Sequence, residues 1–287
     1  MNDAPTNRFG FPQLGFGLGL RHPHYDDILG HWPREVDFFE IISEDFLDAH
    51  EGHWQMLADL RQHYPILMHG VSLSVGSPEP LQHDYLRKLK KLADFLNVPW
   101  LSDHVCWTGV HGINTHDLLP VPYTEAALTH FTNRVKKVQD VLGRPLVLEN
   151  PSTYLHYAAS TMPEYEFLAR LADNADCGIL LDVNNVYVSA FNHRYDAHTY
   201  LDALPADRVV QIHLAGHLHK GTHIIDTHDN HVAYEVWALY ERTIRHMGSK
   251  TTMIEWDAHI PPFATLRAEL DKARATSQKA LTPEAAA

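Results

Sequence analysis

The chain has 287 residues, 45% of them hydrophobic, which is enough to bury the core of one large α/β domain or of two ordinary domains. Its 23 lysines and arginines against 36 aspartates and glutamates give a formal net charge of −13, which argues against nucleic acid or an anionic membrane as a partner. No apolar run approaches the ~18 residues of a membrane span, and the N-terminal MNDAPTNRFGFPQ lacks signal-peptide character, so we expect a soluble, cytoplasmic protein.

The two cysteines also indicate a reducing compartment. Cys106 and Cys177 each lie in an apolar run, HVCW and DCGILL, and such runs favour buried thiols over a disulfide framework. The 23 histidines equal the lysines and arginines in number. Histidine is the commonest metal ligand, but several of these histidines stand in polar, helical surroundings. Their positions, and not their number, must therefore indicate which of them bind metal.

Eight short apolar runs, typical of buried strands, alternate with longer helical patterns. In chain order they are FGLGL (16–20), VDFFEIIS (36–43), PILMHGVSL (65–73), PWLSDHVCW (99–107), PLVLENP (145–151), CGILLDVNN (177–185), VVQIHLAGH (209–217) and TTMIEWD (251–257). Segments 81–97 and 124–143 repeat apolar residues every three or four positions and end near Asn97 and Gly143. Strands without polar alternation are covered on both faces, which predicts a single α/β domain, a (β/α)8 TIM barrel over residues 1–277, with a flexible tail at 278–287.

Polar side chains follow the apolar part of six of these runs. They are His69, Asp103 with His104, Glu149 with Asn150, Asp182 with Asn184 and Asn185, His213, and Glu255 with Asp257. The carboxyl ends of barrel strands form the active-site face, so these side chains should converge on the axis. Any one of them alone is readily explained as a satisfied core group. Buried together, carboxylates and imidazoles are too costly unless cations neutralise them, which predicts metal ions.

The predicted ligands are nitrogen and oxygen donors without a thiolate: His69, His104, Glu149, Asp182, His213, Asp226, His228 and Glu255. Such a set suits iron, manganese, zinc or cobalt. Eight ligands exceed what one ion needs, and a glutamate on a central strand can bridge two ions. We therefore expect a site of two or three metals.

The segment GTHIIDTHDNH (221–231) follows the seventh run and should cover the barrel mouth. Asp226 and His228, two positions apart, can both reach one ion from an extended backbone. His223, Asp229 and His231 are weaker candidates, because Asp229 or Asn230 is expected to N-cap a helix over 231–247. The role of His217, a little earlier in the chain, stays open: it could contact the substrate or lie exposed to solvent.

Seven segments carry a family resemblance: HGVSLSVGS, SDHVCWTG, DLLPVPYTEAAL, LENPSTYL, LLDVNNVYVSAFNH, IHLAGH and DTHDNHV. They resemble the multinuclear non-haem iron-dependent oxidases, the family that includes the methanobactin-biosynthesis oxidase. The match runs from about Gly15 to about Leu270. The family's barrel is similar to those of the xylose isomerase and endonuclease IV superfamily, and the eight predicted ligands occupy the matching positions. Asn185 stands where the endonuclease branch has a histidine ligand, which argues against a trinuclear zinc phosphodiesterase.

The resemblance implies an oxidase with two to three iron ions that uses O2 to modify a cysteine in a ribosomally made precursor peptide during natural-product biosynthesis. It also implies a small partner protein that binds the leader segment of that peptide. Glu149 is expected to bridge two ions. His69 and His104 would lie on one side of it, with Asp182, His213 and Glu255 on the other, while Asp226 and His228 would hold a further ion.

Two residues are candidates for direct roles in catalysis. Asp103 is a candidate proton acceptor or a partner of its neighbour His104, and Asn184 is a candidate for orienting ligands or substrate; a purely structural role stays open for both. Two other functions also stay open for the whole chain. One is a divalent-metal hydrolase or isomerase on the same barrel, and the other is a histidine-rich metal buffer.

Overall fold

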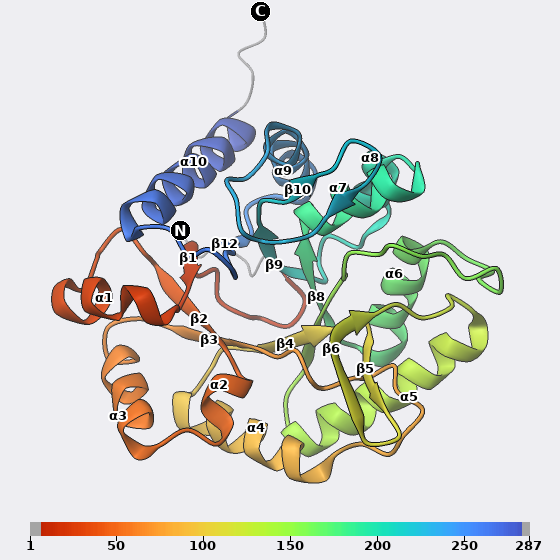
Figure 1. Ribbon diagram of the computed structural model, residues 1–287, viewed down its shortest axis with the longest axis horizontal. Coiled ribbons are helices and arrows are strands. Elements are labelled where there is room, and N and C mark those ends of the chain that lie inside the picture. The colour runs from red at the N-terminus through yellow and green to blue at the C-terminus, as the bar shows by residue number, and fades with distance from the viewer. Residues whose placement is uncertain (1–6, 283–287) are drawn as a thin grey trace, which may run out of the picture.

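The computed structural model describes residues 7–282, which form a closed eight-stranded parallel barrel surrounded by helices (Figure 1). The strands follow each other around the barrel in chain order: β1 (Phe16–Gly19), β2 (Phe38–Ile42), β3 (Ile66–His69), β4 (Leu101–His104), β7 (Leu146–Glu149), β8 (Gly178–Asp182), β9 (Val209–Leu214) and β12 (Thr251–Ile254). β12 then pairs with β1 and closes the ring. The predicted TIM barrel is confirmed, with one strand in each predicted run.

Ten helices cover the described part of the barrel or its loops. They are α1 (Tyr25–His31), α2 (Glu44–Leu47), α3 (Glu51–Leu60), α4 (His83–Leu96), α5 (Glu125–Leu142), α6 (Glu164–Ala175), α7 (Val183–His193), α8 (Ala197–Ala203), α9 (Tyr234–Met247) and α10 (Phe263–Leu281), with a short 3-10 turn at His22–His24. Helices α4 and α5 end where expected, because Asn97 and Gly143 take the left-handed backbone that closes a helix. No helix among residues 7–282 is both long and apolar enough to span a membrane.

Side-chain alternation along the strands separates an apolar barrel floor from a polar barrel top. Residues two apart on a strand face the same side, so the residue two positions after an interior residue also points into the barrel. In this barrel the earlier of the two is apolar and the later one is polar. The floor is a buried cluster that includes Phe38, Leu67, Val147, Leu180 and Met253. Two residues further along the same strands, and one residue past the end of β12, stand Glu40, His69, Glu149, Asp182 and Glu255. The polar interior residues of the barrel therefore lie together, above the apolar floor.

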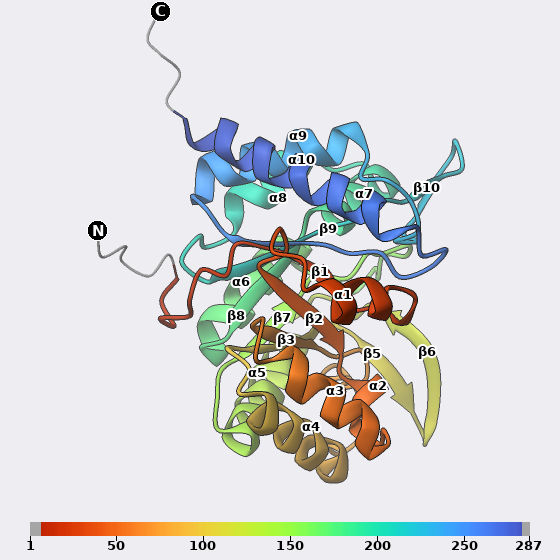
Figure 2. The same cartoon turned by 90° about the vertical axis from the view of Figure 1, so that its left-hand side faces the viewer.

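Two short hairpins not foreseen from the sequence rise beyond the carboxyl ends of the strands (Figure 2). β5 (Trp107–Val110) pairs with β6 (Ile113–Leu119) after β4, and β10 (Leu218–His219) pairs with β11 (Ile224–Ile225) after β9. Both are antiparallel and lie outside the barrel sheet. They stand beside the barrel mouth, on the side where the polar interior residues collect.

Two predicted boundaries differ from the structure. α9 begins at Tyr234 and not at residue 231, because the backbone stays extended through Ala233, and neither Asp229 nor Asn230 caps it. Asp229 instead accepts a hydrogen bond from Thr227 and contacts His259. α10 runs on to Leu281, so residues 278–281 of the predicted tail are helical, while 283–287 lie outside the described residues. Both cysteines are buried free thiols, as predicted.

Candidate metal centre

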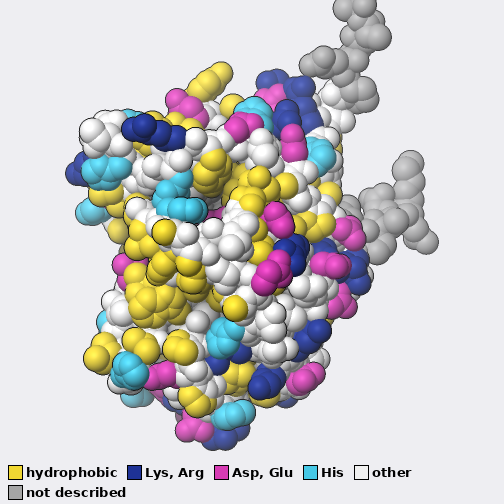
Figure 3. All heavy atoms as spheres, turned by 90° about the vertical axis from the view of Figure 1, so that its right-hand side faces the viewer, with side chains coloured by type: hydrophobic (Ala, Val, Ile, Leu, Met, Phe, Trp, Pro, Cys, Tyr) yellow, Lys and Arg dark blue, Asp and Glu magenta, His cyan; other side chains and the backbone are white. Residues whose placement is uncertain are grey.

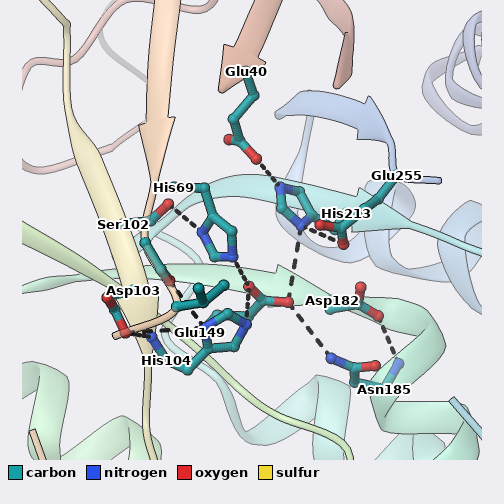
Figure 4. Close-up of polar contacts among 12 residues, drawn as sticks. Glu40, His69, Ser102, Asp103, His104, Glu149, Asp182, Asn185, His213 and Glu255 are labelled. Atoms are coloured by element: carbon teal, nitrogen blue, oxygen red, sulfur yellow. Dashed lines mark hydrogen bonds and ion pairs between the residues drawn. The ribbon is translucent and has the colours of Figure 1, made fainter. Parts of the chain in front are cut away.

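Six of the eight predicted ligands come from the top of the barrel interior and converge there (Figure 4). His69, His104, Glu149, Asp182 and His213 end or nearly end their strands, and Glu255 follows β12 directly. All six are buried, and the side chains of Asp182 and His213 have no exposed surface. Asp226 and His228 reach the same region from the loop between β11 and α9 and are partly buried. All eight predicted positions thus meet at one place.

A first group joins His69 and His104 to Glu149. Their Nε2 atoms lie 3.1 and 3.2 Å from the same oxygen, Glu149 Oε2. The Nδ1 of His104 faces the carbonyl of Gly70 at 3.2 Å, and because a carbonyl only accepts, Nδ1 carries a proton and Nε2 is the nitrogen left to face Glu149. The Nδ1 of His69 lies 2.8 Å from the Ser102 hydroxyl, which itself donates to the Met68 carbonyl. Both rings are therefore set to present Nε2 as a ligand.

A second group shares Glu149 with the first. One donor atom each from Glu149, Asp182, His213 and Glu255 lie within 4.8 Å of one another. His213 Nδ1 is 3.0 Å from Glu255 Oε2 and 3.8 Å from Glu149 Oε1. Glu149 thus turns one oxygen towards each group. A carboxylate in that position is what a bridge between two ions requires.

A third group lies nearest the mouth and consists of His228, Glu255 and Asp257. His228 Nδ1 is 3.1 Å from Glu255 and 3.3 Å from Asp257. Its other nitrogen is 2.8 Å from Asp226 Oδ1, so Asp226 lies on the opposite side of the ring from Glu255. The sequence analysis named Asp257 as a strand-end residue but not as a ligand. Glu255 belongs to two groups, and a second shared carboxylate therefore accompanies Glu149.

The environment of these groups fits cations. Asp182 Oδ2 is buried and has no hydrogen-bond partner among the described residues, and Glu149 Oε2 is buried and faces only the Nε2 atoms of His69 and His104. Burial, together with the neighbouring carboxylates, raises the pKa of Asp182 well above its usual value, although His228 acts in the opposite direction. Burial also lowers the pKa of His69 to about 3, which keeps the ring neutral, the form that binds a metal. Cations between these donors would satisfy the unpaired oxygens and offset the crowding of negative charge.

The two residues predicted to act in catalysis are engaged in local hydrogen bonds. Asp103 is turned towards the backbone, where it accepts from the amides of His104 and Leu73, and burial raises its pKa to about 7. It is not among the residues that line the cavity above the centre. Asn184 donates from Nδ2 to Asp226 Oδ1 at 2.8 Å and contacts His217 Nδ1 at 2.7 Å. Asn184 therefore holds Asp226 and connects it to His217.

The weaker candidates of the 221–231 segment turn elsewhere. His231 Nδ1 lies 2.7 Å from the buried Glu269 of α10, and Asp229 contacts Thr227 and His259. His223 forms a hydrogen bond with the adjacent Thr222 and is exposed. His228 differs from them because its backbone takes a left-handed conformation, with φ of +43°. That turn directs its ring back into the barrel.

Glu40 is a polar residue of the site that the sequence analysis missed. Its Oε1 lies 3.1 Å from His213 Nε2, and its Oε2 accepts from the Gln211 amide at 2.7 Å. Trp100 Nε1 donates to Gln211 Oε1 at 2.8 Å, which fixes the amide orientation. A carboxylate on the far nitrogen of a metal-ligating histidine orients the ring and makes it a stronger donor. The available signal was an acidic residue with two apolar residues on each side of it, FFEII, within the run VDFFEIIS.

Replacing Glu40 by glutamine is expected to weaken metal binding about 10–100-fold, because the contact that orients His213 loses its charge while the shape is kept. Competition with a chelator followed by elemental analysis measures this. Glu51→Gln, at an exposed position in the first turn of α3, is the matched control and should leave metal content unchanged. An E40Q protein that retains its metal as firmly as the wild type would show that Glu40 does not position His213.

Above the centre lies a cavity of about 220 Å³ that opens towards the mouth. Its walls include His69, His104 and Glu255 below, and Leu118, Pro151 and Tyr154 above. One water occupies about 30 Å³ of liquid, so this volume admits a single side chain with a few waters. A substrate larger than that must leave most of its length outside the barrel.

The fold and these three donor groups define a (β/α)8 barrel protein with a candidate multinuclear metal centre at its mouth. Residues 15–278 match the family described as "RiPP precursor modification enzyme MbnB/TglH/ChrH", where RiPP denotes a ribosomally synthesised and post-translationally modified peptide, and the chain belongs to this family.

The chain is also similar to named relatives in sequence and to solved structures in fold. The chain is 52% identical over 264 residues to a UPF0276 protein of Caulobacter vibrioides, covering 92% of this chain and 94% of that one. It is 50% identical over 268 residues to a UPF0276 protein of Anaeromyxobacter sp. (strain Fw109-5), covering 93% and 94%. Among solved structures, the 3-keto-D-glucoside 4-epimerase YcjR from E. coli is similar with a TM-score of 0.60 at 13% identity, covering 92% of this chain and all of that one. Endonuclease IV from Thermus thermophilus has a TM-score of 0.58 at 17% identity, covering 93% and 100%. At these low identities, the likeness to the two solved structures shows a shared barrel fold and nothing more.

Proposed function

We propose that the protein is a multinuclear, iron-dependent oxidase that uses O2 to modify a cysteine of a ribosomally made precursor peptide. The observation that carries this is the sharing of Glu149 between two donor groups, because a bridging carboxylate holds two ions close enough to act together. The nitrogen and oxygen donors suit iron, and the family acts on RiPP precursors. When bound, iron would supply redox chemistry and a binding position for a thiolate.

The residues of the chain would divide the remaining work. His69, His104 and Glu149 would hold one ion, and Asp182 and His213 with the two shared glutamates a second. His228 and Asp257 with Glu255 would hold a third position nearer the mouth, where Asp226 lies beside His228. Hydrogen bonds that the Nδ1 atoms of His69 and His104 donate to Ser102 and to the Gly70 carbonyl keep these two histidines in the tautomer that binds metal.

The small cavity would admit only the reacting side chain of the peptide. Leu118, Pro151 and Tyr154 at its walls would exclude most water around that side chain, which strengthens its interaction with the metal centre. The leader segment would then lie outside the barrel. We propose that a small partner protein binds that leader, since the cavity itself has no room for it.

The test combines metal analysis with turnover of a peptide. Protein produced with added iron and purified without oxygen is expected to contain about two to three irons per chain. With O2 it should change the mass of a cysteine-containing precursor peptide and leave the matched cysteine-to-serine peptide unchanged. The same donors also suit zinc or manganese in a hydrolase or isomerase. Zinc or manganese alone, with iron unable to replace it on reconstitution, would favour that second function and contradict the oxidase.

A further inference from the structure

A second cavity, of about 490 Å³, lies beside helices α6 and α8. No residue of the metal centre lines it. Its walls come from the segment just before α5, from the loop before α6 with the first turn of that helix, and from the chain between the end of α7 and the middle of α8. Figure 3 views this side of the molecule, where hydrophobic side chains gather on the half towards the barrel mouth. The volume lies in the range of small-ligand sites, about 300–1,000 Å³.

The one charged residue among the lining residues is Glu164, at the first position of α6. Its two oxygens accept hydrogen bonds from two phenols, Tyr200 at 2.7 Å and Tyr123 at 2.8 Å. Within residues 7–282 it forms no ion pair with a lysine, arginine or histidine. Burial raises its pKa, and the two phenols oppose that effect only in part. Glu164 is thus a partly buried carboxylate without a countercharge, beside open space.

The rest of the lining is mainly aromatic, with Thr153, Leu155 and Pro163 beside tyrosine and histidine rings, and it offers hydrogen-bond acceptors. Four tyrosines, Tyr123, Tyr165, Tyr195 and Tyr200, line the cavity, and no lysine or arginine does. His193 Nε2 donates to the Thr153 carbonyl at 3.0 Å, which leaves Nδ1 as an acceptor, and burial lowers the pKa of this ring. The buried Tyr195 hydroxyl has no hydrogen-bond partner in the described part of the chain. A carboxylate among tyrosine rings is a favourable environment for a cation, through the ion pair and through the ring faces.

We propose that this cavity binds an organic cation, either the side chain of a lysine or arginine or a small free amine, through the Glu164 carboxylate and the surrounding tyrosine rings. The position also relates it to the metal centre. Pro151, Ser152 and Tyr154 line the cavity above the metal centre, whereas Thr153 and Leu155 of the same loop line this one. One loop therefore forms a wall of both cavities. The proposal uses no metal ligand and stands whether or not the chain is an oxidase.

The test titrates the whole protein with two cations and their neutral counterparts, followed by ligand-observed NMR. The cations are n-butylammonium and the tripeptide acetyl-Ala-Lys-Ala-amide, and the neutral probes are n-butanol and the same tripeptide with norleucine in place of lysine. We expect saturable binding of at least one cation and at least about tenfold weaker binding of its neutral counterpart. If n-butylammonium binds as tightly as the lysine tripeptide, the ligand is a free amine. If only the tripeptide binds, the ligand is a peptide side chain.

Two variants locate the binding. Glu164→Gln keeps the shape and removes the charge, so affinity should fall at least about tenfold, while Glu166→Gln, exposed on the same helix, should bind like the wild type. Leu155→Trp changes a half-exposed wall residue and should block the cavity even if the Glu164 variant does not fold. The proposal is overturned if neither cation binds the wild type saturably, if the neutral probes bind equally well, or if L155W binds the cations unchanged.

Discussion

Glu149→Gln is expected to lose two neighbouring metal positions at once. Glu149 turns Oε2 towards His69 and His104 and belongs with Asp182, His213 and Glu255 in the second group. An amide keeps the volume but has neither the charge nor a second oxygen, so it cannot bridge. Loss of an orienting partner alone costs about 10–100-fold in metal affinity or activity, and loss of the shared ligand should cost more than about 100-fold.

The same variant should leave the fold in place. In the metal-free protein Glu149 lies near other buried carboxylates, so removing its charge relieves repulsion as well as removing a partner of the histidines. We expect the metal-free forms of variant and wild type to unfold within about 1 kcal/mol of each other, roughly 2–4 °C in Tm. Elemental analysis, activity and thermal unfolding with and without metal check this, with Glu51→Gln as the exposed control. Full metal loading of E149Q would contradict the bridging role.

Gly216→Ala should disrupt the mouth of the barrel from a distance. A Cβ at Gly216, just past β9, would lie 2.1 Å from the carbonyl oxygen of Asn230 and 2.6 Å from that of His231. Both atoms belong to the backbone, so no side-chain rotation can relieve the overlap. The affected loop is the one that carries Asp226 and His228. The loop must move, and the third donor group would lose its histidine.

We expect G216A to be destabilised by at least about 2 kcal/mol, a fall in Tm of roughly 4–8 °C, together with loss of the metal nearest the mouth. Gly30→Ala provides the control, because its Cβ would meet no atom within 4 Å and its position in α1 favours alanine by about 0.5–1 kcal/mol. Thermal unfolding and elemental analysis of both variants measure the two effects. If G216A matched G30A in stability and metal content, the close approach of the loop to Gly216 would be wrong.

The barrel could be predicted from the sequence because its strands are buried on both faces. Runs such as PILMHGVSL and CGILLDVNN keep no polar alternation until they reach His69 and Asp182, and that change marks the top of each strand. The periodicity of the helical segments separated them from the strands. Since strand tops meet at one end of a barrel, the convergence of the site followed from the order of the runs alone.

What the sequence left undetermined depends on contacts between distant residues. Glu40 stands before the end of its run, and only the closed barrel brings it against His213. The hairpin strands β5 and β6 include exposed polar residues of a kind that a loop would also carry. The N-cap predicted for α9 is wrong because Val232 is buried and the chain stays extended through Ala233. The helix therefore begins at Tyr234, three residues after the start of the amphipathic pattern. Local patterns contain none of this information.

Closure of the barrel through β1 and β12 sets an order for events during protein synthesis. Phe16 pairs with Thr252, so β1 keeps an unpaired edge until β12 has been made. The first donor group is present once residue 149 has emerged, whereas the second and third wait for Glu255 and Asp257. On the ribosome, the residues of the donor groups therefore become available in two stages, the first group well before the other two.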